Sequence, residues 1–168
     1  MQVKYKGNMV ELADGDNGFK AIKELEKENK NKAVAMKVNG SVEDLSRELK
    51  DGDEVEFVLP SSPEGFEVIN HSCAHLLAQA VSHLYPEAKF GYGPAVEEGF
   101  YYDIDFGNKK ISDADFEAIE KEMKKLAKED LPFKRNEVSK DEALKIFAAN
   151  PYKEEHIGEL EGDITTYQ

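Results

Sequence analysis

Residues 54–65, which read Glu54-Val-Glu-Phe-Val-Leu-Pro-Ser-Ser-Pro-Glu-Gly65, decide the organisation of the fold. The first half alternates charged and apolar residues with period two, which is typical of a strand with one buried face. The second half is a cluster of Pro, Ser and Gly, which is typical of a linker that ends a strand. The stretch therefore divides the chain into two domains, residues 1–62 and residues 63–168.

The 1–62 domain has the pattern of a small α+β fold. The expected elements are strands at 1–5 and 9–12, a helix beginning at 17 or 18, a strand at 33–38, a short helical turn at 45–49 and a strand at 54–59. One helix packed on a mixed sheet is the simplest way to bury the apolar faces of these elements. The order predicts a β-grasp, ubiquitin-like domain.

The 63–168 domain also mixes helices and strands. The expected elements are a helix at 67–85, strands at 89–95 and 100–105 joined by a turn at 97–99, a helix capped by Ser112, a strand at 133–138, a helix capped by Ser139 and ended by Asn150-Pro151, and a strand-like run at 163–167. The pattern predicts an α+β domain with helices on an antiparallel sheet. The last run ends without a closing element, so we expect a truncated domain.

Apolar residues at three- and four-residue steps define the buried face that each of these helices is expected to have. They are Ile69, Cys73, Leu76, Ala80 and Leu84 on the first helix, Phe116, Ile119, Met123 and Leu126 on the second, and Ala143, Ile146 and Phe147 on the third.

Composition excludes several classes of protein. The 168 residues carry 22 Lys and Arg against 35 Asp and Glu, a net charge of −13, which argues against a protein that coats nucleic acid over its whole surface. A local basic patch stays compatible with this charge. No apolar run approaches the roughly 18 residues needed to span a bilayer, and the N-terminus lacks the apolar core of a signal peptide. The single Cys fits a reducing cytosol.

Two histidines are the first candidates for chemistry. His71 and His75 are four residues apart on the expected 67–85 helix, so both imidazoles project from one face, about 6 Å apart at Cβ. Such a pair can hold a metal, or can position a water and a substrate hydroxyl for proton transfer. Two unrelated surface histidines give the same spacing. The zinc-protease motif requires Glu directly after the first His, where this chain has Ser72.

The hairpin after this helix is rich in Gly and aromatic residues. Phe90-Gly-Tyr-Gly-Pro94 and Gly99-Phe-Tyr-Tyr102 bring them close to one another. Gly in a strand marks a close approach of a ligand or of another backbone, and an exposed Tyr can stack on a nucleobase. Alternate aromatic residues that simply face the core would give part of the same pattern.

Four motifs in order carry a resemblance to a known family. They are Asn70-His-Ser-Cys-Ala-His-Leu-Leu-Ala-Gln-Ala80, Gly93-Pro94, Glu98-Gly-Phe-Tyr-Tyr-Asp-Ile-Asp105 and Asn150-Pro-Tyr-Lys153. Together they resemble the N-terminal region of bacterial threonyl-tRNA synthetases. Residues 1–62 are similar to the TGS domain of that family, and residues 63–168 are similar to the first two thirds of its editing domain.

The resemblance implies hydrolysis of serine that is mis-attached to threonine tRNA, at the 3′ end of the tRNA. By the family's pattern, His71 and His75 would hold the terminal adenosine, its hydroxyl and the attacking water. Lys153 matches a catalytic-site lysine suited to contacts with an oxyanion or a hydroxyl. Tyr102 matches a pocket tyrosine, and Gly93 matches a backbone that approaches the substrate closely. No metal is expected at this site.

The resemblance also implies parts that residues 1–168 do not contain. The family completes the editing site with a downstream Cys-x-x-x-His motif, so we expect half a site, with weak or no deacylation and weak tRNA binding. The ATP, magnesium and zinc sites and the dimer-forming catalytic core of the parent synthetase also lie outside the chain. We therefore expect a cytoplasmic monomer with no cofactor and no aminoacylation activity.

Two other functions stay open from the residues alone. The histidine pair is compatible with a metal-binding hydrolase. A non-catalytic docking module of the β-grasp type needs only the first domain, with incidental histidines.

Overall fold

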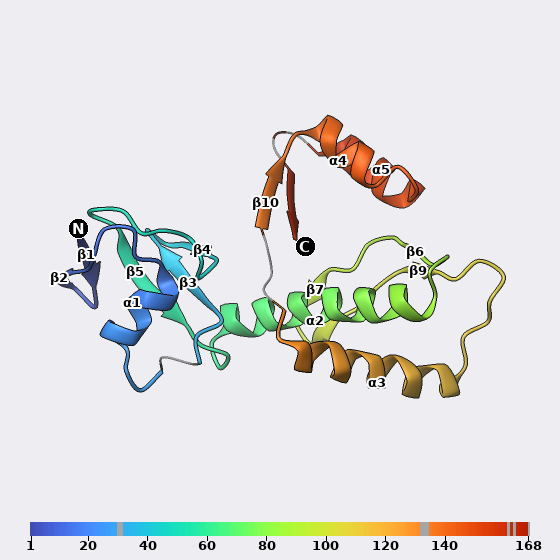
Figure 1. The fold of residues 1–168 in the computed structure, drawn as a ribbon, viewed down its shortest axis with the longest axis horizontal. Helices are drawn as coiled ribbons and strands as arrows, with labels where there is room; N and C mark the ends of the chain where they lie inside the picture. The colour runs from blue at the N-terminus through green and yellow to red at the C-terminus, as the bar shows by residue number, and fades with distance from the viewer. Residues whose placement is uncertain (30–31, 132–134, 161, 163, 168) are drawn as a thin grey trace. The chain divides into compact units, whose positions relative to one another are not determined.

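The computed structural model describes residues 1–29, 32–131, 135–160, 162 and 164–167 (Figure 1). The chain forms two compact units, residues 1–70 and residues 71–168, each of which has its own buried core. Among the described residues, no helix is both long enough and apolar enough to cross a membrane.

The first unit is a mixed five-stranded sheet with one helix. Its elements are β1 (Gln2–Tyr5), β2 (Asn8–Glu11), α1 (Gly18–Leu25), β3 (Ala35–Val38), β4 (Ser41–Glu43) and β5 (Glu54–Val58). The strand order is β2-β1-β5-β3-β4, in which β1 and β5 are parallel and the other neighbours are antiparallel. The mixed sheet and single helix agree with the predicted fold class.

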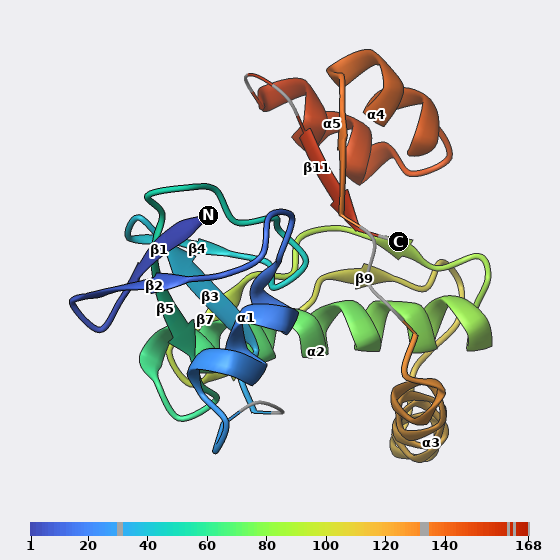
Figure 2. The same cartoon turned by 60° about the vertical axis from the view of Figure 1, so that its left-hand side comes forward.

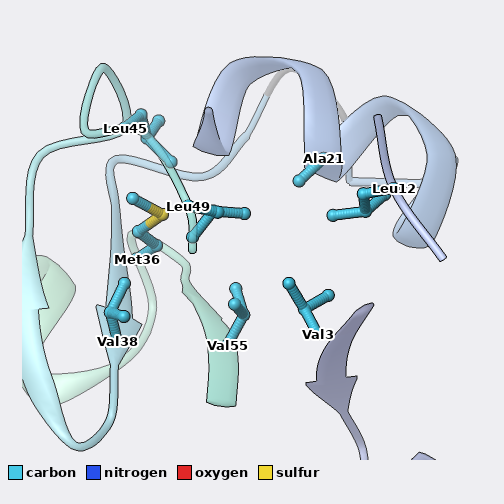
Figure 3. Close-up of a cluster of buried hydrophobic side chains, with 8 residues drawn as sticks. All are labelled: Val3, Leu12, Ala21, Met36, Val38, Leu45, Leu49 and Val55. Carbon is cyan, nitrogen blue, oxygen red and sulfur yellow. The ribbon is translucent and has the colours of Figure 1, made fainter. Parts of the chain in front are cut away.

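Helix α1 covers one face of this sheet (Figure 2). Asn17 caps it by accepting a hydrogen bond from the Lys20 N–H at 3.2 Å. The side chains that fill the space between helix and sheet are Val3, Leu12, Ala21, Met36, Val38, Leu45, Leu49 and Val55 (Figure 3). Val3, Met36 and Val55 have no exposed surface, and neither has Ala21, so the centre of this core lies between α1 and the strands β1, β3 and β5.

The helical turn predicted at 45–49 is wrong, and the strand β4 precedes that segment instead. Backbone groups of the segment bond to another part of the chain: the Leu45 C=O accepts from Phe19 at 3.2 Å, and the Leu49 N–H donates to the Asp16 C=O at 2.9 Å. These groups are therefore not available for bonds within a helix. Leu45 and Leu49 are nevertheless buried, as their apolar character indicates.

The Pro, Ser and Gly cluster at 60–65 is a hydrogen-bonded turn that leads directly into a helix. The Ser62 N–H and hydroxyl both donate to the Leu59 C=O, and the Ser62 hydroxyl accepts from the Gly65 N–H at 3.1 Å. Helix α2 (Pro63–Leu84) begins at Pro63, four positions before the predicted start. Proline is favourable at the first position of a helix because its missing N–H would have no partner there.

The second unit contains most of α2 and all later elements. They are β6 (Lys89–Phe90), β7 (Ala95–Val96), β8 (Gly99–Phe100), β9 (Ile104–Asp105), α3 (Asp113–Glu129), β10 (Arg135–Val138), α4 (Lys140–Ile146), α5 (Pro151–Glu159) and β11 (Ile164–Tyr167). The antiparallel pairs are β6 with β9, β7 with β8 and β10 with β11. The two predicted hairpin strands are thus each divided in two, with residues 91–94 and 101–103 outside the strands.

Helices α2 and α3 lie side by side in Figures 1 and 2 and share a core of Ala80, Val81, Ile119 and Leu126. Phe116 was expected in this core, but 56% of its surface is exposed. Near the first turn of α3, Tyr85 packs on Phe106 and donates to the Asp115 carboxylate at 2.6 Å. The apolar residues that pack around this core do not include Phe116. Leu84, at the end of α2, is also exposed.

A second cluster joins α4, α5 and β11 through Ala143, Ile157 and Ile164. Ile146 was expected to be buried with Ala143, but 52% of its surface is exposed. The cluster covers α4 only around Ala143, Leu144 and Phe147, and this leaves the Ile146 side uncovered. The strand predicted at 133–138 is present from Arg135, since 133 and 134 lie outside the described residues.

Helix α5 was not predicted. Asn150-Pro151 was interpreted as the end of a helix, but α4 ends at Ile146 and Pro151 is the first residue of α5. The run after α5 is the strand β11, which pairs with β10 from Val138–Ile164 to Arg135–Tyr167. The strand prediction for this run is confirmed for residues 164–167, and the run does have a pairing partner.

Candidate functional site

His71 and His75 lie one turn apart on α2, as their spacing predicts. Their Nε2 atoms are 3.1 Å apart, which is hydrogen-bonding distance, so that one ring donates to the other. The ring centroids are 4.7 Å apart and the planes meet nearly at right angles, at 83°. Both residues keep substantial exposed surface, whereas Ala74 and Ala80 on the same helix are buried. The helix therefore presents two linked imidazoles toward solvent.

The single cysteine does not join this pair. Cys73 is a free thiol with an intermediate exposure, two residues from each histidine. In the part of the chain that the structure describes, no three or more His, Cys, Asp or Glu side chains are grouped closely enough to hold a metal ion. The pair itself offers two imidazole ligands.

Tyr102 lies half-buried between β8 and β9 and is held by two neighbours. Its ring packs edge-on against the Phe90 ring of β6, with centroids 5.7 Å apart. On another side it lies against Gly93, where an added Cβ would be only 2.5 Å from a carbon of the Tyr102 ring. The absence of a side chain at Gly93 therefore lets the backbone approach the tyrosine. Adjacent Tyr101 is exposed.

Lys153 reaches this region from α5, the helix that was not predicted. Its Nζ atom lies 6.0 Å from the centroid of the Tyr102 ring, at the outer limit of a cation–π contact. Burial lowers the pKa of the Lys153 ammonium below its ordinary value. The lysine is therefore a partly desolvated cation above an aromatic ring.

The pKa of His75 depends on the nearby lysine. It is lowered first by desolvation, then by the neighbouring His71, and then by the positive charge of Lys153. His75 keeps one side open to solvent, but enough protein surrounds its ring to disfavour the imidazolium. A neutral imidazole near pH 7 can accept a proton, and an ammonium nearby can stabilise negative charge.

A hollow of about 540 Å³ lies beside this cluster, between the hairpin and α5. Its walls include Tyr92 and His156, whose rings are 5.6 Å apart, and Tyr152, whose hydroxyl donates to the Asp105 carboxylate at 3.0 Å. Gly91, Asp103, Ile104 and Glu155 complete its lining. None of the five predicted site residues lines the hollow, so we place the candidate chemistry at the exposed histidine pair and not in it.

The five residues selected from the sequence form one chain of neighbours. His71 contacts His75, and the charge of Lys153 acts on His75. Lys153 lies over Tyr102, and Gly93 packs against Tyr102. The sequence interpretation did not assign a role to the side chain of Asn150 or to the backbone of Phe90, which bond to each other. The only local signal was the Asn150-Pro151 pair, and it was interpreted as a helix stop.

Comparisons with known proteins agree with the motifs. Residues 3–62 match the model of the ThiS family, which fits a β-grasp-like first domain. A threonine–tRNA ligase from Staphylococcus saprophyticus is 43% identical over 99% of the chain, and one from Thermotoga petrophila is 42% identical over 95%. A third, from Acholeplasma laidlawii, is 43% identical over 90%.

These similarities span most of this chain but only a part of each relative. The aligned region is 26%, 26% and 24% of the three ligases, so the chain spans about a quarter of their length. The chain is thus homologous to a portion of threonine–tRNA ligases, and the resemblance found in its motifs is confirmed for that portion.

Proposed function

We propose that this chain is the proofreading region of a threonine–tRNA ligase and takes part in the hydrolysis of serine wrongly attached to threonine tRNA. The observation that carries the proposal is the grouping of a hydrogen-bonded histidine pair with a partly desolvated lysine, over a tyrosine with a glycine beside it. Homology to ligases over nearly the whole chain supplies the class of substrate.

The chemical need for such a site follows from the size of the amino acids. Serine lacks only one methyl group of threonine, and one methyl group changes binding by about 1–3 kcal/mol, too little for accurate protein synthesis. A second site that hydrolyses the wrong product supplies the missing discrimination. The substrate there is an ester between the amino acid and a ribose hydroxyl of the terminal adenosine.

The histidine pair fits the first half of ester hydrolysis. A water attacks the acyl carbon, and a base must take its proton as the new C–O bond forms. Burial, His71 and Lys153 lower the pKa of His75, so its ring is neutral near pH 7 and has a nitrogen lone pair available for that proton. The hydrogen bond with His71 fixes the orientation of the His75 ring. We assign to the pair the positioning of the water and of the ribose hydroxyl.

Lys153 fits the second half. Negative charge develops on the acyl oxygen, and later on the ribose oxygen as the ester bond breaks and that oxygen takes up a proton. An ammonium group that has lost part of its water shell stabilises such charge better than one in bulk solvent. Tyr102 and Gly93 shape the adjacent wall, where the glycine backbone packs directly against the tyrosine ring.

The proposal assigns only part of the site to this chain. The resemblance implies a Cys-x-x-x-His motif. Residues 1–168 do not contain it, because Cys73 is their single cysteine and the residue four positions later is Leu77. The ATP, magnesium and zinc of aminoacylation would likewise belong to the remaining three quarters of a ligase of the relatives' length. No step proposed for this chain uses a metal.

The test is deacylation by the ligase that contains this chain. We expect the unaltered ligase to hydrolyse seryl-tRNA and to spare threonyl-tRNA, and we expect His71→Ala to lower the seryl-tRNA rate by about 10²–10⁴-fold. His83→Ala is the matched control, since His83 is on the same helix but pairs with Glu122 of α3. Full activity of His71→Ala would contradict the assignment. Stoichiometric metal that is lost in His71→Ala would favour the metal-binding hydrolase instead.

A further inference from the structure

Asn150 uses its side chain in an unexpected way. It occupies the position before the first residue of α5, where asparagine is among the preferred capping residues. Its side chain nevertheless makes no capping bond to α5. Instead, the Nδ2 group donates to the C=O of Phe90, 60 positions earlier in the chain, at 2.9 Å. Capping of the helix is therefore forgone for a bond to strand β6.

The amide is also buried at some cost. The Oδ1 atom of Asn150 is fully buried and has no hydrogen-bond partner among the described residues. A buried acceptor without a partner is unfavourable. A side chain that only fills space at this position would not need an amide. The hydrogen bond from Nδ2 to Phe90 gives the amide a role.

The bond from Asn150 to Phe90 closes a ring of contacts that contains Lys153. The Asn150 C=O accepts the N–H of Lys153 at 3.1 Å, which links the anchor to the lysine within the first turn of α5. The Phe90 ring packs on the Tyr102 ring at 5.7 Å, and the Lys153 Nζ atom lies 6.0 Å from that ring. The first turn of α5 and Phe90 of β6 thus together define where the Lys153 ammonium lies.

We propose that Asn150 is a positioning residue: by fastening the start of α5 to the backbone of β6, it holds the Lys153 ammonium beside Tyr102 and the histidine pair. The catalytic meaning of this placement rests on the proposed function, but the placement itself does not. Pro151 supports the role because its fixed backbone angle, directly after the anchor, orients the first turn of the helix.

The direct test is Asn150→Ser, observed by NMR of the Lys153 side chain and of the histidine rings. Serine can still cap α5 and carries no charge, but its short side chain does not reach the Phe90 carbonyl. We expect the pKa of Lys153 to rise toward its ordinary value as the ammonium gains solvent. We expect the pKa of His75 to rise as well, because the lysine charge moves away. Unchanged pKa values for both groups would overturn the proposal.

Two further variants separate positioning from general loss of stability. Ser139→Ala removes the capping box of α4, next to α5, and should leave both pKa values unchanged. Asn150→Ser combined with Gly158→Ala keeps the test possible if the single variant is too unstable, because Gly158 lies in α5 with open space around it. The same pKa shifts are expected in the double variant, and their absence there would also contradict the proposal.

Activity gives an independent readout in the ligase that contains this chain. Asn150→Ser should lower kcat for seryl-tRNA deacylation on the order of 10²-fold, with a smaller change in KM, because the lysine is misplaced while most substrate contacts remain. If the unaltered ligase shows no deacylation, the proposed function fails, but the pKa shifts still decide whether Asn150 positions Lys153. The two proposals can therefore fail separately.

Discussion

Among single residues, His75 is the one whose chemistry depends most on its neighbours. Two histidines four apart on a helix are common, and their spacing alone does not distinguish a catalytic pair from a surface pair. The structure adds a third group, Lys153, whose positive charge acts on His75. Three influences then lower the pKa of one ring, so a larger fraction of His75 is neutral at neutral pH than of an isolated imidazole.

This lowered pKa makes stability depend on pH. The unfolded His75 titrates near 6.5, while the folded ring titrates lower, so between these values the unfolded chain binds more protons. The free energy of unfolding is therefore unaffected by this group above pH 6.5 and decreases as the pH falls below 6.5. We expect His75→Gln to remove this part of the dependence in urea unfolding between pH 5 and 8. If the free energy of unfolding depends on pH equally in the variant and the parent, the lowered pKa of His75 is contradicted.

The close approach at Gly93 gives a second prediction for a single residue. An alanine Cβ there would lie 2.5–2.7 Å from three carbons of the Tyr102 ring, so the ring or the backbone must move. We expect Gly93→Ala to destabilise the second unit by about 1–3 kcal/mol in urea unfolding. Gly158→Ala is the matched control, since no atom lies within 4 Å of its added Cβ and alanine favours a helix. A neutral or stabilising Gly93→Ala would show that Tyr102 is free to move.

For whole elements, local sequence patterns predicted where helices form more reliably than what packs against them. Helices α2 and α3 follow from apolar periodicity, and the capping boxes at Ser112 and Ser139 mark the starts of α3 and α4. The exposure of Phe116 and Ile146 depends on what packs beside each helix, and periodicity along one helix does not contain that information. The first unit shows the same limit at 45–49, where bonds to residues 16–19 replaced a helical turn.

Helix α5 was not predicted because the dipeptide Asn-Pro occurs both at the ends and at the starts of helices. Asn-Pro ends a helix when the residue before proline leaves the helical region, and it begins one when proline is the first helical residue. In this chain α4 already ends at Ile146, so Asn150-Pro151 begins the next helix. The dipeptide alone does not show where the preceding helix ends, so it does not distinguish the two cases.

The turn between β5 and α2 provides a prediction for this element. A Cβ added to Gly65 would lie 1.9 Å from the Leu59 carbonyl oxygen, a backbone atom that is itself held by two bonds from Ser62. We expect Gly65→Ala to destabilise the chain by more than about 2 kcal/mol and to expose this turn to limited proteolysis. Ser61→Ala, at an exposed position of the same turn, should change neither. Tolerance of Gly65→Ala would restore the interpretation of this segment as a loose linker.

For the molecule as a whole, the site combines elements that are distant in sequence. The histidine pair was predictable from spacing on one helix, but Lys153 and Tyr102 entered only through the resemblance, because they come from α5 and the hairpin. The net charge of −13 does not conflict with a tRNA substrate. A site that binds only the 3′ end needs a local cation and does not need an extended basic surface. Asn150 belongs to the Asn150-Pro-Tyr-Lys153 motif, but its bond to the Phe90 carbonyl is not predictable from that motif.

The two units have separate cores, so each should respond to its own substitutions. Met36 is fully buried in the first core and Ile119 is 7% exposed in the second, and no described residue belongs to both clusters. Met36→Ala and Ile119→Ala should each destabilise their own unit by about 2–5 kcal/mol through lost contacts and a residual cavity. We expect calorimetry to resolve two transitions, with each substitution lowering a different one. A single transition lowered equally by both would show that the continuous helix α2 couples the units into one cooperative fold.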